Sequence, residues 1–162
     1  MYNLYIPLCG LVVNIILILV YSWKATKTKE ENKFYIYMLV DTLIMTLFCM
    51  AAVFLIYIKY DENIIKLTNK IECAAICNYF ANLLTYIIYT CGLNNKKTNK
   101  IYLIVNAIII FLVFITPVSL EVTSDLTYMV TVGPSVDITT ICSGFFLISS
   151  LILAIKNRNK IK

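Results

Sequence analysis

Asp41 is the residue whose type and position most clearly suggest chemistry in this chain. It is the single charged residue of the hydrophobic run 34–58. If a helix starts at Phe34, Asp41 lies roughly 10 Å along it. An ionised carboxylate in mid-bilayer costs at least ~2.5–3.5 kcal/mol, so the side chain is expected to face other helices or water. Two interpretations follow: a buried, proton-sensitive switch, or a hydrogen-bonding residue that only holds helices together.

Asn78 and Asn82 are the amides best placed to act with it. They stand four residues apart in the run 71–93, so on a helix they share one face. Amides of this kind hydrogen-bond between membrane helices for ~0.6–2 kcal/mol each. The pattern indicates either a packing seam or, together with Asp41, a cluster that binds a ligand.

Several kinds of chemistry are excluded by composition. The chain has no histidine and only nine acidic residues, so no imidazole serves as a general base or metal ligand. The six cysteines lack the spacing of a metal site, and we interpret them as buried thiols, with an outer disulfide left open. We therefore expect no catalytic site, no bound metal and no cofactor in these residues.

The overall composition is that of an integral membrane protein. Of 162 residues, 60% are hydrophobic and 14% charged, with a mean hydropathy of +0.83, whereas soluble domains are ~45–50% apolar and ~25% charged. The 14 basic residues are scattered between apolar runs, which excludes a nucleic-acid-binding surface. Five runs are long enough for helices that cross ~30 Å of hydrocarbon. They cover about 5–23, 34–58, 71–93, 101–120 and 138–155.

The predicted fold class is therefore all-α: residues 1–162 form a single domain, a bundle of five transmembrane helices in the cell membrane. Its orientation follows from the positive-inside rule. If the spans alternate, one side collects 11 of the 14 basic residues, after spans one, three and five. The opposite loops hold three lysines and six acids. The N-terminus is thus predicted outside and the C-terminus in the cytoplasm.

The longest connection, residues 119–137, lies in the predicted outer loops. Pro117 is expected to kink or end span four, because proline lacks an N–H and clashes one turn back. Gly133 and Pro134 predict a turn followed by a proline at the first helical position. Asp137 would then sit in the first turn, where a carboxylate is favourable. The segment 130–132 is expected on the membrane surface.

Four short segments resemble a known class of membrane region. Residues 5–14 read Tyr-Ile-Pro-Leu-Cys-Gly-Leu-Val-Val-Asn, and Lys27-Thr28-Lys29-Glu30 precedes span two. Gly133-Pro134-Ser135-Val136 opens span five, and Lys156-Asn157-Arg158-Asn159-Lys160 follows it. In this order they resemble the multi-span N-terminal sensor region of sensor histidine kinases from low-GC Gram-positive bacteria. Related regions precede some diguanylate cyclases.

The resemblance implies a signal-input domain of a bacterial two-component system that detects an extracellular or membrane-borne signal. It also implies a truncated or excised region, without the kinase part, and a homodimer within the lipid bilayer. The residues leave one alternative, a small complete carrier or permease subunit in which Asp41 and the asparagines line a path. Against the carrier, no lysine or arginine lies within any span to pair with Asp41, and no paired halves are visible.

Overall fold

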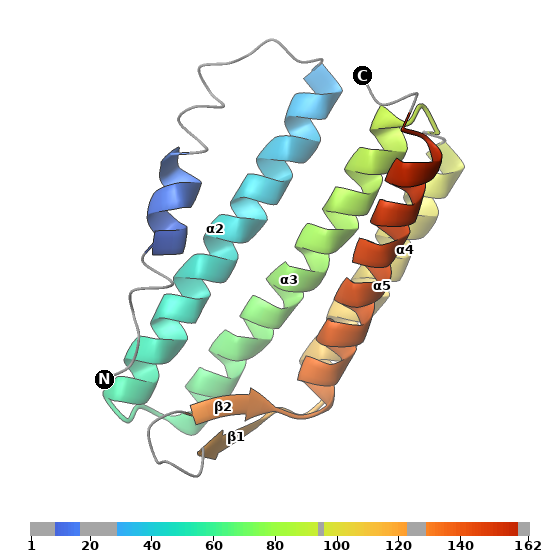
Figure 1. Cartoon of the computed structure of the whole chain (residues 1–162). Coiled ribbons are helices and arrows are strands. Elements are labelled where there is room, and N and C mark those ends of the chain that lie inside the picture. The colour runs from blue at the N-terminus through green and yellow to red at the C-terminus, as the bar shows by residue number, and fades with distance from the viewer. Residues whose placement is uncertain (1–8, 17–28, 94–95, 123–128, 159–162) are drawn as a thin grey trace.

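The computed structural model describes residues 9–16, 29–93, 96–122 and 129–158. A short helix covers residues 9–16. Four longer helices follow, and all are labelled in Figure 1: α2 (Lys29–Tyr57), α3 (Glu62–Thr90), α4 (Lys96–Ile115) and α5 (Pro134–Lys156). Two strands, β1 (Ser119–Val122) and β2 (Met129–Val132), lie between α4 and α5.

The outer surface is apolar, unlike that of a soluble protein. Large apolar side chains point outward from every long helix, among them Phe54, Leu103, Phe111 and Ile141. Polar side chains are buried in the interior beside apolar ones: Asn14, Asp41, Thr68, Asn69, Ser135, Thr139, Ser143 and Ser150. Exposed apolar surface of this extent is stable against lipid rather than water. Among the described residues, three helices are long and apolar enough to cross a membrane, within Phe34–Tyr57, Glu62–Thr90 and Pro134–Lys156, so this is a membrane protein.

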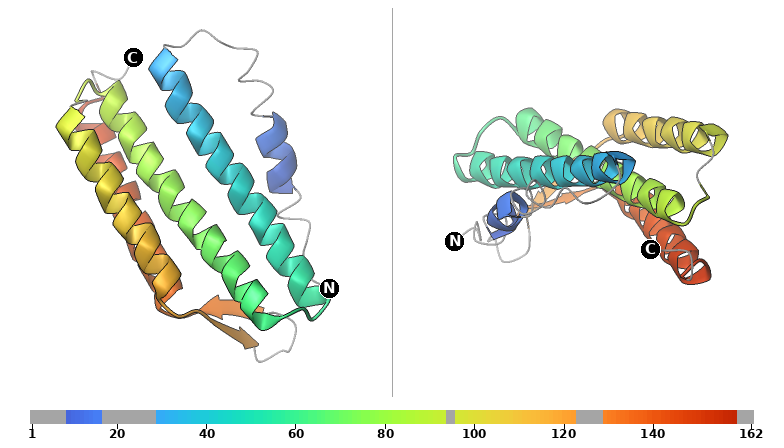
Figure 2. Two further views of the ribbon diagram at one scale, coloured as in Figure 1. Left: turned by 180° about the vertical axis from the view of Figure 1, so that it is seen from behind. Right: turned by 90° about the horizontal axis from the view of Figure 1, so that it is seen from above.

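Helix α3 lies at the centre of the bundle. It packs against α2, α4 and α5, and α4 also packs against α5. The view from above in Figure 2 shows the consequence, with α2 on one side of α3 while α4 and α5 diverge on the other. The largest hydrophobic cluster joins Ala81, Leu84 and Ile88 of α3 to Phe146 of α5. Small residues on α3 let the neighbouring helices approach closely, as is typical of membrane packing.

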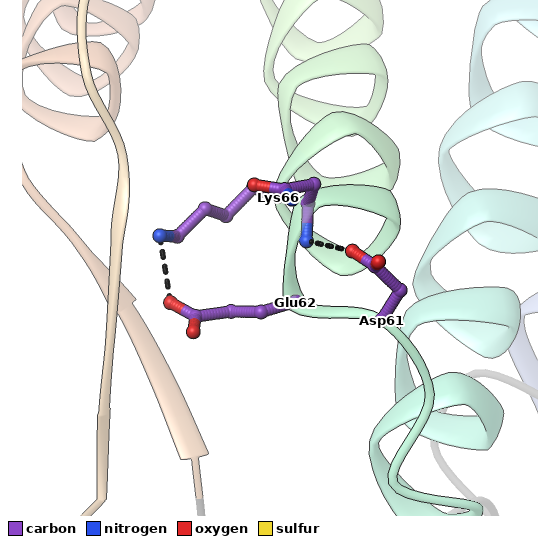
Figure 3. A network of polar contacts seen from close by, with 4 residues as sticks. Asp61, Glu62 and Lys66 are labelled. Carbon is purple, nitrogen blue, oxygen red and sulfur yellow. Dashed lines mark hydrogen bonds and ion pairs between the residues drawn. The ribbon is translucent and has the colours of Figure 1, made fainter.

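The helix bounds differ from the predicted spans in an informative way. Predicted span one is described only at 9–16, where it is helical. Helix α3 starts nine residues before predicted span three, because residues 62–70 are helical although too polar for hydrocarbon. Asp61 caps this start, and its carboxylate accepts a hydrogen bond of 2.7 Å from the backbone N–H of Asn63. In Figure 3 the cap is seen beside the ion pair between Glu62 and Lys66.

Span four ends early, and Pro117 is the reason. The apolar part of α4 is the short stretch Lys100–Ile115, and the helix stops there rather than at residue 120. Proline at 117 has no N–H to give to the Val113 carbonyl one turn back. The hydroxyl of Ser135 donates to this carbonyl instead, at 3.0 Å. The next carbonyl, of Phe114, accepts from the Lys70 ammonium at 2.7 Å. Side chains of α5 and α3 thus donate hydrogen bonds to the last carbonyls of α4.

The connection from α4 to α5 contains a hairpin that the all-α prediction missed. Strands β1 and β2 pair antiparallel, with Ser119 opposite Val132 and Val122 opposite Met129. Residues 130–132 therefore belong to a strand that pairs with β1, a pairing that the sequence analysis did not predict. A four-residue strand is too short to give a reliable signal beside long apolar runs. The Asn69 amide of α3 donates to the Thr131 hydroxyl at 2.8 Å and holds the hairpin at this end of the bundle (Figure 1).

The predicted start of the last helix is confirmed. Pro134 is the first residue of α5, Gly133 precedes it as the cap, and Asp137 lies exposed in the first turn. Gly133 has φ +118° and ψ 177°, a conformation open essentially only to glycine. A Cβ atom there would also lie 3.3 Å from the Pro117 carbonyl oxygen. This glycine lets the hairpin return directly into α5.

We expect Gly133→Ala to lower the free energy of unfolding by about 1–3 kcal/mol. Alanine would be strained in this backbone conformation, and its Cβ would also lie too close to the Pro117 carbonyl oxygen. Gly144→Ala, in the interior of α5 with open space around it, is the matched control and should be neutral or stabilising. Thermal unfolding of both variants in detergent measures this difference. Equal midpoints for Gly133→Ala and the wild type would contradict the role given to this residue.

Candidate functional site

Asp41 lies in the interior, held by two amides. Its side chain is 6% exposed. Oδ1 accepts a hydrogen bond of 2.7 Å from the Asn78 amide, and Oδ2 accepts one of 2.7 Å from the Asn82 amide. The structure thus brings together the three residues that the sequence singled out. Their spacing explains the geometry, since two residues four apart on α3 present both amides to one carboxylate on α2.

A third amide extends the cluster to α4. The Asn106 side chain donates to the Asn78 Oδ1 oxygen at 2.8 Å. We call Asp41, Asn78, Asn82 and Asn106 the polar bridge, because it runs from α2 through α3 to α4. Asn106 lies inside the apolar run 101–120. Its place in the cluster depends on the order of the helices, which periodicity does not reveal.

The hydrogen bonds of the polar bridge have a fixed direction. An ionised carboxylate only accepts, so both α3 amides must turn their NH₂ groups toward Asp41. The Asn78 oxygen is then free to accept from Asn106. The remaining oxygen of Asn106 is buried and has no hydrogen-bond partner among the described residues. The chain of donors therefore runs one way, from Asn106 to Asn78 to Asp41.

A second polar contact joins the 9–16 helix to α2. The Asn14 amide donates to the Thr46 hydroxyl at 3.1 Å and to the Thr42 carbonyl at 3.4 Å. Gly10 lies against the Thr46 methyl group, where a Cβ would be 3.6 Å away. The residue that precedes Thr42 in α2 is Asp41, so this contact adjoins the polar bridge. A buried amide again takes the place of apolar packing between two helices.

The other predicted site residues lie elsewhere. Gly133, Pro134 and Asp137 stand at the hairpin end of the bundle, whereas Asp41 lies in the middle of α2 (Figure 1). The structure does not bring the two groups together. The Gly133 carbonyl instead accepts from the backbone N–H groups of Val136 and Asp137, at 2.9 and 3.1 Å. These residues shape the start of α5.

The cysteines are unpaired. All six are free thiols. Cys73, Cys77 and Cys91 are buried as predicted, whereas Cys49 and Cys142 are half-buried and Cys9 is exposed, so the prediction of buried thiols was wrong for these three. The described residues contain no group of three histidine, cysteine or acidic side chains that could hold a metal. The polar bridge is accordingly a hydrogen-bonding device built from carboxylate and amide groups.

Comparisons with protein-family models, curated proteins and solved structures gave no match. The arguments on function consequently rest on the contacts of this chain.

We expect Asn78→Leu to cost roughly 1–3 kcal/mol of stability, because it removes two hydrogen bonds and leaves the Asp41 carboxylate with one donor fewer. Asn106→Leu is the comparison: it removes one bond and exchanges the unpartnered oxygen of Asn106 for that of Asn78, so its cost should be about 0.6 kcal/mol, the value of one interhelical hydrogen bond. The midpoints of thermal unfolding in one detergent compare the two. Equal losses would mean that Asn78 is not the centre of the polar bridge.

Proposed function

We propose that this chain is the membrane-embedded signal-input region of a bacterial signal-transduction protein, such as a sensor histidine kinase. The observation that carries the proposal is the polar bridge. A buried carboxylate on α2 that is bonded to two amides of α3, one of which is bonded to an amide of α4, favours one relative packing of these helices, and a change in its charge or spacing favours another. Signal transfer requires two packings of this kind, whereas a purely apolar bundle has little to discriminate them.

A series of contacts that connects α3 through the hairpin to the start of α5 supports the same proposal. The hairpin is tied to α3 through Asn69 and Thr131, and β2 leads into α5 through Gly133 alone. The start of α5 is in turn tied to α4 by Ser135. A signal that displaces the hairpin therefore shifts the first turn of α5. In the sensor regions that the chain resembles, one or two further spans usually follow before the cytoplasmic output domain, so the far end of α5 would lead toward it.

The proposal includes five spans, with the N-terminus outside and the C-terminus in the cytoplasm. The connection between α2 and α3 then faces outward, and the residues after α5 face the cytoplasm. In a cysteine-free background, we expect Tyr60→Cys to react with a membrane-impermeant maleimide in intact cells. Arg158→Cys, the control at the opposite end, should react only after the cells are permeabilised. The reverse pattern would contradict the orientation.

The signalling role is tested first by measuring the molecular mass of the protein as its native cells produce it. An antibody against the peptide 24–33 should detect a band well above 18.5 kDa, because an input region is continuous with its output domain. In that longer protein, Asp41→Asn should shift the activity of the output domain while the protein remains in the membrane at the normal level.

A band at 18.5 kDa alone would contradict the fused arrangement. It would favour the runner-up, a small carrier or permease subunit, for which the one specific observation is the same row of polar groups across the bundle. A carrier would lose flux on Asp41→Asn with its folding intact.

A further inference from the structure

A groove at the hairpin end of the bundle combines basic and apolar groups. It has a volume of about 380 Å³ and lies between the first turns of α3 and the end of α4. Asn63, Lys66 and Lys70 line its polar side, and Leu67, Phe114 and Pro117 line its apolar side. We propose that this groove binds the phosphate head group and upper acyl chain of an anionic phospholipid. The proposal is independent of the signalling role.

The height of the groove in the membrane supports a lipid. The hydrophobic run of α3 starts at Ile71, and the preceding nine residues of the helix are rich in polar side chains. These residues extend roughly 13 Å, which is enough to cross the head-group layer. Lys70 reaches the Phe114 carbonyl at the end of α4, so the groove spans the border between hydrocarbon and head groups.

Lys70 is positioned in advance for an anion. One N–H of its ammonium donates to the Phe114 carbonyl at 2.7 Å. An ammonium carries three donors, so two remain for phosphate oxygens. A side chain that is already fixed loses little conformational freedom on binding. The hydrogen bond that completes α4 therefore also places a positive charge at the mouth of the groove.

Lys66 adds a second charge one turn away. It is paired with Glu62 at 2.6 Å, and both side chains are partly exposed (Figure 3). Glu62 does not line this groove; it lines the neighbouring one of about 350 Å³, together with Lys59 and Leu120. The two grooves thus differ in charge, since the first has two lysines and no acid among its lining residues and the second has one of each.

The apolar wall distinguishes a lipid from a free anion. Leu67 and Phe114 are exposed to the surroundings, as is Ile64 on the same part of α3. The groove therefore opens onto the apolar surface that faces acyl chains. A phospholipid would contact both the lysines and the apolar wall of the groove, whereas a soluble phosphate would leave the apolar wall uncovered.

The test is lipid binding by the purified chain, measured by native mass spectrometry with phosphatidylglycerol and phosphatidylcholine. We expect one tightly retained phosphatidylglycerol and weaker retention of phosphatidylcholine. Lys66→Gln and Lys70→Gln should each weaken phosphatidylglycerol binding roughly fivefold. This factor corresponds to about 1 kcal/mol, the contribution of one basic residue near an anionic surface. Glutamine at 70 keeps a donor for the Phe114 carbonyl, so the fold is preserved, and circular dichroism checks this.

Lys59→Gln is the matched control, with the same change in charge at the same end of the bundle, and it should leave binding unchanged. An equal loss in Lys59→Gln would show unspecific surface attraction and overturn the site. Equal retention of the two lipids by the wild type would overturn it as well. Displacement of phosphatidylglycerol by millimolar inorganic phosphate would assign the lysines to a free anion instead of a lipid.

Discussion

A polar atom inside this bundle can find a hydrogen-bond partner only within the protein, because hydrocarbon supplies none. Among the described residues, three buried side-chain atoms lack one, namely Asn106 Oδ1, Ser143 Oγ and Ser150 Oγ. An unsatisfied group there costs several kcal/mol, more than most packing contacts contribute. The helices are therefore arranged so that their few buried polar groups meet. Asp41 imposes the strongest demand, since its carboxylate needs donors on both oxygens, and α3 supplies both from one face. The central position of α3 follows from this demand.

The same constraint operates at the hairpin end with backbone groups. Pro117 ends α4 and deprives the Val113 carbonyl of its donor. Ser135 of α5 and Lys70 of α3 supply the donors that the last turn of α4 lacks. The bundle is thus joined at two levels, by amides around a carboxylate in the middle and by side chains that complete a helix at the end. Between these levels Cys73 and Cys77 of α3 form a buried cluster with Val113 of α4.

Much of this arrangement could be predicted from the sequence, and the misses have physical reasons. The start of α5 at Pro134 and the shared face of Asn78 and Asn82 are local properties of chain geometry, so spacing alone reveals them. The partnership of Asn106 with Asn78 is not local, because it depends on which helices are neighbours. The start of α3 at Glu62 could not be predicted from hydropathy. Hydropathy identifies the part of a helix that lies in hydrocarbon, and it does not identify a polar extension of the same helix. The hairpin was missed because strand pairing over four residues leaves almost no periodic signal.

The bond between Ser135 and Val113 has a consequence for the order of biosynthesis. The two residues are separated by 22 positions, so the end of α4 leaves the ribosome before its hydrogen-bond donor exists. Lys70, by contrast, is synthesised earlier and can occupy the Phe114 carbonyl as soon as α4 meets α3. Until Ser135 is made, the Val113 carbonyl has only the Thr116 hydroxyl, at 3.5 Å, as a donor among the described side chains. The shorter bond to this carbonyl therefore forms only after the synthesis of α5 has begun.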